Sequence, residues 1–254
     1  MSYQEFQPHP ALQPYIDAYW VMKSDRPSAT TERIYSDGCI DIILNLGDDF
    51  LTDNGRVKMK HEAAYLVGTM TEYMNVTVAH DTYLLGIRFK PLGFPTFYQF
   101  SSLHEIANKT IDFNRRLLPP VYVYDHNTIP ALDNFFCKKI SDSCRVLAGP
   151  LDSIKRNKGI VVIDQLARQH FMSDRKMERQ FRRYLGISPK EYARFVRYQH
   201  AKQLIETRPP EESLLGLAIE TGFYDHAHLT NEIKKYSGLV PSQLRDVGLS
   251  PDGR

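Results

Sequence analysis

The chain has 254 residues, enough for two ordinary domains, and its 42% hydrophobic and 24% charged residues are usual for a soluble globular protein. No run approaches the roughly 20 apolar residues needed to cross a bilayer. The N-terminal segment also lacks the basic and apolar stretches of a signal peptide. We therefore expect a cytoplasmic protein without a membrane partner. Cys39, Cys137 and Cys144 form no CxxC pair, so reduced thiols are expected.

Charge is distributed unevenly along the chain. Residues 1–149 contain 14 Lys and Arg against 17 Asp and Glu, a net charge of −3. Residues 150–254 contain 18 against 13, a net charge of +5. A split of this kind suggests that the second half binds a polyanion. A solvated helix face would produce the same excess, so charge alone leaves both interpretations open.

The N-terminal part of the chain, up to about Thr110, is rich in strand patterns. Apolar runs at 39–46, 65–67, 75–79 and 83–89 predict strands, and Asn54-Gly55 between polar residues predicts a hairpin turn. These elements favour a β-rich α+β domain, for which a cupin-like barrel is one option.

Helical spacing begins after Pro95. Apolar residues within 97–106 and 128–147 recur at intervals of three and four, and the segment after Gly149-Pro150 is polar. The remainder of the chain reads as helices, so the predicted fold is multidomain, a β-rich domain followed by an all-α domain. The expected organisation is an N-terminal domain at 1–148, a linker at 149–158 and a second domain at 159–254.

The second domain contains an internal repeat in which matching positions recur at a nearly constant offset. The matched pairs are Leu166-Ala167 with Leu217-Ala218, Ser173 with Asp225, Met177 with Leu229, Phe181 with Ile233, Gly186 with Gly238, and Pro189 with Pro241. Because the matched residues are apolar or mark helix ends, one helix-turn-helix unit is expected to occur twice.

In the first copy, Ser173 is expected to cap a helix that buries Met177 and Phe181. Residues three and four apart share a helix face, so the opposite side presents a basic stripe. That stripe comprises Arg175, Glu178, Arg179 and Arg182. A guanidinium group can pair with O6 and N7 of guanine in the DNA major groove.

In the second copy, Asp225 is expected to cap a helix that buries Leu229 and Ile233. Its exposed side is predicted to present a polar set that can contact bases or phosphates. That set comprises His226, His228, Thr230, Asn231 and Lys234.

A third helix is predicted between the copies. Ser188, Pro189 and Glu191 have the spacing of a capping box with proline at the first helical position, and the helix is expected to continue to about Ile205. Such a helix would be a rigid connector between two DNA-contacting units. Arg194 and Arg197 on it contact phosphates, support packing or stay solvated.

These residues resemble the AraC/XylS family of transcription regulators. The resemblance rests on Leu166-Ala167, Phe181-Arg182-Arg183, Gly186-Ile187-Ser188-Pro189, Ala201, Leu204, Ala218, Gly222 to Leu229, and Gly238. It implies binding to double-stranded DNA through two recognition helices in adjacent major grooves, and a role as an activator that works with RNA polymerase. Phe171 departs from the family pattern because that position is usually Gly, and Val240-Pro241 replaces Ser-Pro.

The N-terminal part of the chain resembles a domain found on a subset of these regulators. The matching segments are Leu12 to Ile16, Tyr19-Trp20, Ser36 to Asp41, Asn45 to Asp48, and Gly86 to Pro91. The family architecture implies that this domain senses a small-molecule effector, which the sequence does not identify, and forms a homodimer.

Other interpretations of the N-terminal domain stay open. The domain is a protein-interaction module in one alternative and, in a weaker one, a cupin-like enzyme fused to the DNA-binding domain. Its aromatic residues Tyr15, Tyr19, Trp20, Phe94, Phe97 and Tyr98 line a ligand cavity or form plain core. Arg33, Arg88 and Lys90 hold an anionic effector or are surface charges.

Neither a metal site nor an enzyme active site is expected. His226 and His228 lie about 200° apart on a helix, which does not suit two ligands of one metal ion. The sequence contains no P-loop, nucleophile elbow or dinucleotide-binding motif. We therefore predict no catalytic residues, no metal and no cofactor.

Overall fold

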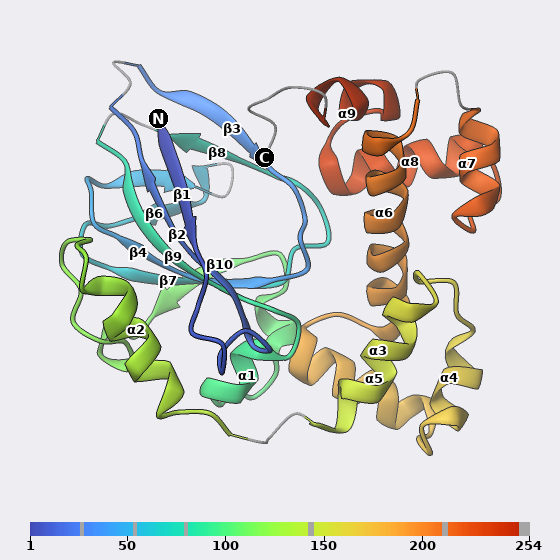
Figure 1. The fold of residues 1–254 in the computed structure, drawn as a ribbon, viewed down its shortest axis with the longest axis horizontal. Helices are drawn as coiled ribbons and strands as arrows, with labels where there is room; N and C mark the ends of the chain where they lie inside the picture. Colours follow the sequence, from blue (N-terminus) through green and yellow to red (C-terminus); the bar gives the residue numbers. More distant parts are fainter. Residues whose placement is uncertain (26–27, 53–54, 79–80, 142–144, 210–212, 249–254) are drawn as a thin grey trace.

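The computed structural model describes residues 1–25, 28–52, 55–78, 81–141, 145–209 and 213–248. Figure 1 shows a β-rich half, drawn in blue to green, beside a helical half, drawn in yellow to red. The chain is thus a β-rich α+β domain followed by an all-α domain, as the sequence predicts.

A six-stranded antiparallel sheet is the framework of the N-terminal domain. Its strand order is β1-β2-β9-β4-β7-β10, so β1 and β10 are the edges. The strands are β1 (Ser2–Phe6), β2 (Ile16–Lys23), β9 (Tyr83–Phe89), β4 (Ile40–Asn45), β7 (Ala64–Val67) and β10 (Thr110–Phe113). The strands predicted at 39–46, 65–67 and 83–89 are confirmed.

Two antiparallel ribbons complete the β structure of the described residues. The first pairs β3 (Thr30–Ile34) with β8 (Met74–Val78), and the second pairs β5 (Phe50–Thr52) with β6 (Val57–Met59). The hairpin predicted around Asn54-Gly55 is confirmed by this second pairing. Asn54 itself, like the predicted strand end Ala79, lies outside the described residues.

The sheet has an apolar core on each face, because successive side chains of a strand point to opposite sides. Trp20 and Tyr65 pack with Phe50 of the second ribbon. Their neighbours Tyr19 and Leu66 belong to a larger core on the other face. Of the six aromatic residues considered for a ligand cavity, five are buried and Tyr15 packs against the same core. These residues therefore form core.

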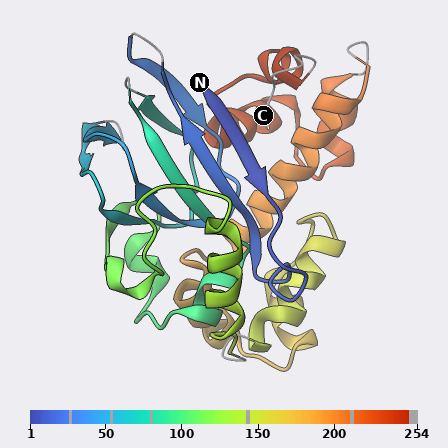
Figure 2. The same cartoon turned by 60° about the vertical axis from the view of Figure 1, so that its left-hand side comes forward.

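Short helices cover that larger core. They are α1 (Gly93–Phe97), α2 (Thr128–Cys137) and the 3₁₀ turn η2 (Leu103–Ile106). The 3₁₀ turn η3 (Arg115–Leu117) has no buried residue, and η4 (Arg145–Leu147) places Leu147 in the core of the helical domain. Figures 1 and 2 show α1 and α2 together at the lower end of the sheet. The helix predicted across 128–147 is shorter than expected, because α2 ends at Cys137. Cys144 lies outside the described residues.

The segment predicted as a linker, 149–158, is mostly helical. Helix α3 (Ala148–Arg156) places Leu151 and Ile154 in the core of the helical domain. The prediction of a linker is therefore wrong in its structure. The polar residues that suggested it occupy the exposed side of α3, while Pro150, Leu151 and Ile154 form its buried side.

The helical domain is organised around one long helix. Its elements after α3 are α4 (Ile163–Gln169), α5 (Asp174–Leu185), α6 (Pro189–Thr207), α7 (Leu214–Glu220), α8 (His226–Ser237) and α9 (Pro241–Gly248). Helix α6 contributes Tyr192, Phe195, Tyr198, Ala201 and Ile205 to the core. In the described part of the chain, no helix combines the length and the apolar character that a membrane crossing requires.

Candidate nucleic-acid interface

Two helix-turn-helix units lie at opposite ends of α6 (Figure 1). Helices α4 and α5 form the first unit, and α7 and α8 the second, as the sequence repeat predicts. The predicted N-caps are confirmed: Ser173 accepts a hydrogen bond from the Lys176 N–H at 3.2 Å, and Asp225 accepts one from the His228 N–H at 2.7 Å. Gly186 and Gly238 end the two second helices in the left-handed conformation.

The residues predicted to form the basic stripe on α5 fall into two groups, one exposed and one engaged within the protein. Arg175 and Arg179 are exposed. Glu178 instead accepts a hydrogen bond from Arg182 Nε at 2.7 Å, and Arg182 Nη1 donates to His104 Nε2 of the N-terminal domain at 2.8 Å. Two guanidinium groups are therefore accessible to an external partner, while the third is engaged within the protein.

Helix α8 presents most of its predicted polar set to solvent. The exposed residues are His226, His228, Asn231 and Lys234. Thr230 is half-buried, and its hydroxyl donates to the His226 carbonyl at 2.8 Å. The His228 ring lies edge-on to Phe223 with 5.3 Å between centroids, so its orientation is fixed by the buried core.

The connector begins as predicted. The Ser188 side chain accepts from the Glu191 N–H at 3.1 Å, and the Glu191 carboxylate accepts from the Ser188 N–H at 2.8 Å. Pro189 is the first helical residue. Helix α6 has 19 residues, which corresponds to about 28 Å at the usual rise per residue. It is long enough to hold the two units apart.

Two arginines of α6 join the connector to the second unit. Arg194 Nε donates to Oε2 of the buried Glu232 on α8 at 3.2 Å, and a second bond joins Arg194 Nη2 to Oε1. Arg197 Nη1 donates to the Gly222 carbonyl at 2.7 Å, and its guanidinium lies 5.2 Å from the Phe223 ring centroid. Of the three roles considered for these arginines, the structure shows the packing role.

The turns of the two units differ. Gly222 has φ of 75°, which glycine adopts freely, whereas Phe171 in the first turn has φ of 53°. The Phe171 side chain is 97% exposed. The family-specific glycine is therefore missing while its backbone conformation is retained.

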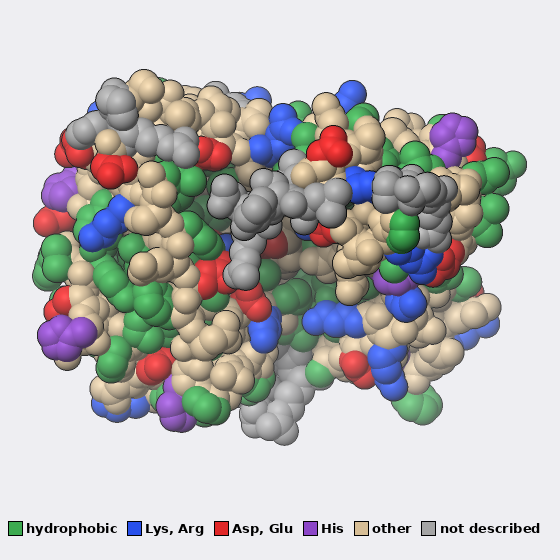
Figure 3. All heavy atoms as spheres, turned by 45° about the horizontal axis from the view of Figure 1, so that its top comes forward, with side chains coloured by type: hydrophobic (Ala, Val, Ile, Leu, Met, Phe, Trp, Pro, Cys, Tyr) green, Lys and Arg blue, Asp and Glu red, His purple; other side chains and the backbone are tan. Residues whose placement is uncertain are grey.

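Basic side chains gather on the helical half. Figure 3 shows Lys and Arg more often over that half, at the right, than over the β-rich half. This surface agrees with the net charges of the two halves of the sequence.

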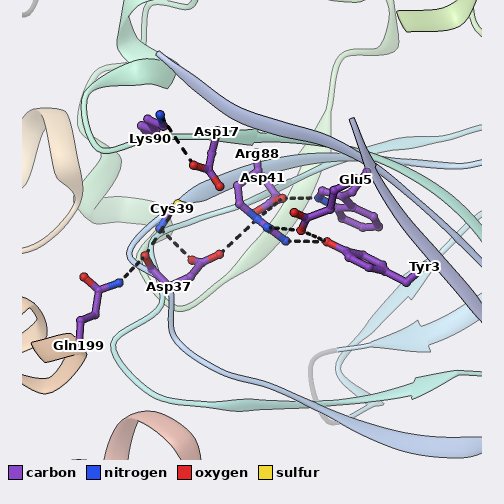
Figure 4. Close-up of polar contacts among 10 residues, drawn as sticks. Tyr3, Glu5, Asp17, Asp37, Cys39, Asp41, Arg88, Lys90 and Gln199 are labelled. Carbon is purple, nitrogen blue, oxygen red and sulfur yellow. Dashed lines mark hydrogen bonds and ion pairs between the residues drawn. The ribbon is translucent and has the colours of Figure 1, made fainter. Parts of the chain in front are cut away.

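Arg88 belongs to a cluster of polar residues in the N-terminal domain (Figure 4). Its guanidinium lies 3.0 Å from Glu5, 3.4 Å from Asp37 and 3.8 Å from Asp41. The Trp20 indole N–H donates to Asp41 at 2.8 Å. Burial, and next the charge of Asp37, raises the pKa of Asp41 to about 7. Because three carboxylates already face Arg88, the idea that it holds an anionic effector is not supported.

The other two cations considered for an anionic effector are also engaged. Lys90 donates to the Gln13 carbonyl at 2.9 Å and lies 3.9 Å from Asp17. Arg33 donates to the Gly238 carbonyl of the helical domain at 3.3 Å. Within the described residues, no group of three His, Cys, Asp or Glu is arranged to hold a metal ion.

Sequence patterns do not indicate the contacts between the two domains. Thr69, His104 and Tyr73 of the N-terminal domain hydrogen-bond to the ends of α5 and α8. None of these residues belongs to a motif. The one available signal is the glycine that ends each helix, Gly186 and Gly238, since glycine permits close approach of another segment.

Comparison with known families agrees with the two-domain arrangement. Residues 166–246 match the profile of a helix-turn-helix domain, and residues 4–112 match that of a domain of unknown function (DUF6597). The chain is 30% identical over 99 residues to the probable transcription factor PqrA of Proteus vulgaris, a match that covers 39% of this chain and 79% of PqrA. It is 29% identical over 90 residues to the transcriptional activator RhaR of Salmonella heidelberg strain SL476.

The RhaR match covers 35% of this chain and 31% of RhaR, so it concerns one domain. An uncharacterized helix-turn-helix regulator of Haemophilus influenzae is 36% identical over 83 residues, which is 33% of this chain and 27% of that protein. Among solved structures, ToxT from Vibrio cholerae has a TM-score of 0.51 at 10% identity, covering 97% of this chain and 98% of ToxT. The full-length two-domain fold is therefore shared. The chain belongs to the AraC/XylS family of transcription regulators.

Proposed function

We propose that this chain is a sequence-specific DNA-binding transcription regulator in which α5 and α8 enter adjacent major grooves of double-stranded DNA. The observation that carries the proposal is the exposure of Arg175 and Arg179 on one N-capped helix and of His226 and Asn231 on the other. A continuous helix joins the two units, as two grooves on one face of DNA require.

The residues are assigned different roles in recognition. Arg175 and Arg179 suit guanine, and Asn231 suits adenine. His226, His228 and Thr230 would contact bases or phosphates, and Lys234 would contact phosphate. Glu178 and Arg182, which hydrogen-bond to each other, remain among the residues proposed to contact DNA. Arg182 can reach DNA only if its hydrogen bond to His104 breaks.

Selection from random DNA with the full chain is the direct test. We expect one recurrent sequence with two half-sites. The Arg179→Ala variant should lose about 1–3 kcal/mol of binding free energy on that sequence and relax preference at one base pair. Arg116→Ala is the matched control, because Arg116 is an exposed arginine of the N-terminal domain. If Arg179→Ala weakens specific and random DNA equally, its proposed role in base recognition is wrong.

We also infer that the N-terminal domain senses a small molecule. A groove between Tyr35–Asp37 and α6 is lined by residues of both domains, so a ligand there would contact both. One ToxT structure, with a TM-score of 0.50 and 10% identity, contains a bound naphthalenyl butenoic acid. Metabolite mixtures should then shift DNA affinity. An unchanged affinity, together with a stable protein complex, would instead favour the protein-interaction module.

The remaining features are proposed from the family. The relatives are transcription regulators, which supports a role other than catalysis. RhaR is an activator by name, which supports activation and contact with RNA polymerase. A bacterial DNA target would place the protein in the cytoplasm. Homodimerisation through residues 1–148 stays a prediction, and sedimentation of the full chain would test it.

A further inference from the structure

The N-terminal domain contacts the C-terminal ends of both recognition helices. Carbonyl groups in the last turn of a helix lack partners within the helix. At the end of α5, the Thr69 hydroxyl donates to the Leu185 carbonyl at 2.7 Å and His104 Nδ1 donates to the Gly186 carbonyl at 2.9 Å. At the end of α8, the Tyr73 N–H donates to the Lys235 carbonyl at 3.3 Å.

One short segment of the N-terminal domain makes a contact with each helix. We call residues Gly68 to Tyr73, between β7 and β8, the bridging loop. Thr69 of this loop bonds to α5 and Tyr73 bonds to α8. They are four positions apart in sequence, so their Cα atoms are separated by at most about 14 Å. The loop therefore links the ends of two helices that belong to different helix-turn-helix units.

The bridging loop is itself held by side chains. Asn108 Oδ1 accepts from the Thr71 N–H at 2.6 Å, and Asn108 Nδ2 donates to the Thr71 hydroxyl at 2.9 Å. On its other side, the Ser36 hydroxyl donates to the Met70 carbonyl. With both flanks fixed, the loop can transmit a constraint from one helix to the other.

The two contacts are close, against backbone at Gly186 and against a side chain at Gly238. A Cβ atom on Gly186 would lie 2.9 Å from the Leu103 carbonyl oxygen, and one on Gly238 would lie 2.9 Å from the Tyr73 ring. The exposed residues Arg175 and His226 lie at the opposite, N-terminal ends of the two helices. The N-terminal domain thus holds the recognition helices while Arg175, Arg179, His226 and Asn231 stay exposed, and it engages only Arg182 of the proposed contact set, through His104.

We propose that the bridging loop is a positioning element for DNA recognition: it fixes the separation and relative orientation of α5 and α8, and so sets the half-site spacing that the protein accepts. This inference rests on the proposed function. Thr69, Tyr73 and Asn108 act through the two helices and contact no base.

The test measures affinity of the full chain for the selected operator and for versions with one or two base pairs inserted or deleted between the half-sites. Each half-site is also measured alone, with the other randomised. The variant is Thr69→Val with Asn108→Gly. Glycine suits the Asn108 φ of 58°, and valine removes one hydroxyl at nearly constant shape. Thr77→Val, an exposed threonine on β8, is the matched control.

We expect the variant to lose about two- to thirtyfold of the wild-type preference for the native spacing, the usual range for altered coupling between two sites. Affinity for each half-site alone should equal that of the wild type. An unaltered spacing profile, a parallel loss at isolated half-sites, or tighter binding at all spacings would overturn the inference. If the double variant does not fold, the single Thr69→Val variant gives the same comparison. Failure of the wild-type chain to select any DNA would contradict the proposed function itself.

Discussion

Phe171 shows how one residue can retain a conformation for which its side chain is unsuited. A left-handed backbone costs an L-residue roughly 1–2 kcal/mol, and the 97% exposed ring gains little burial in return. Phe171→Gly should therefore raise the free energy of unfolding by about 0.5–1 kcal/mol, with the flexibility of glycine in the unfolded chain offsetting part of the gain. Urea unfolding measures the change.

The control for this substitution is Phe171→Ala, which removes the ring and keeps the strained conformation. It should leave stability nearly unchanged. Equal stabilisation by alanine and glycine would show that the exposed ring, rather than the backbone, is the source of the cost. A loss of DNA affinity in both variants at unchanged stability would add Phe171 to the DNA interface.

Asp41 should make stability depend on pH. Its pKa is raised by burial and by Asp37 to about 7, so the folded chain holds a proton that the unfolded chain releases near pH 4. The contribution of this group is therefore greatest at low pH and is lost as the pH rises through about 7. Asp41→Asn has no charge to bury. Its stability relative to the wild type should increase from pH 5 to pH 8.

Thermal unfolding of both proteins across that range tests the prediction. Asp48→Asn, at an exposed aspartate of the same domain, is the control. A difference between wild type and Asp41→Asn that stays constant from pH 5 to pH 8 would contradict it.

Residues that act locally could be predicted from the sequence, and residues with distant partners could not. Ser173, Asp225 and Ser188 cap helices through backbone groups in the next turn, so spacing alone identified them. Arg88 on β9 meets Glu5 on β1 and Asp37, both of which are remote from it in the sequence. No local pattern indicates such partners.

At the scale of elements, the pair formed by Arg194 and Glu232 joins the connector to the second recognition helix. Glu232 is 5% exposed, so removing Arg194 takes away the hydrogen-bonded partner of a buried carboxylate and leaves only the charge of Arg197 to compensate it. Because Arg194 is itself partly exposed and Arg197 remains, Arg194→Ala should lower the free energy of unfolding by about 2–4 kcal/mol, somewhat less than loss of a fully uncompensated buried pair. Chemical denaturation monitored by circular dichroism measures it.

Arg156→Ala provides the comparison, because the Arg156–Asp152 pair on α3 is largely exposed. Surface pairs of this kind contribute about 0–1 kcal/mol. Similar losses in the two variants would mean that the α6–α8 pair does not stabilise the helical domain more than a surface pair.

Elements with strong periodicity were predicted well, and weakly patterned ones were not. The repeat and the capped connector identify α4 to α8 because each signal occurs within one helix. Helix α3 is predicted as a linker because few residues mark its buried side, namely Pro150, Leu151 and Ile154, and the Gly149-Pro150 pair at its start is typical of a boundary. Tertiary packing, which a single sequence does not display, stabilises that helix.

At the scale of the whole molecule, the placement of the two domains follows from contacts that carry no sequence signature. Carbonyl groups of Leu185 and Lys235 are the acceptors, and every residue has a carbonyl. The difference in net charge between the two domains can be predicted from the sequence, because a net charge is a sum that does not depend on how the residues are arranged in space. The charge difference therefore leads to a prediction about the full chain.

DNA binding should weaken steeply with salt, because each Lys or Arg that neutralises a phosphate releases counterions. The logarithm of the binding constant should fall linearly with the logarithm of salt concentration, by about 0.9 per phosphate contact. Lys176 is exposed in the first turn of α5, so Lys176→Ala should reduce the slope by about 1 on specific and random DNA alike. Lys60→Ala, at an exposed lysine of the acidic N-terminal domain, should leave the slope unchanged. Equal slopes for all three proteins would remove Lys176 from the interface. A reduced slope for Lys60→Ala would mean that DNA also contacts the β-rich domain, and that the two domains bind DNA together.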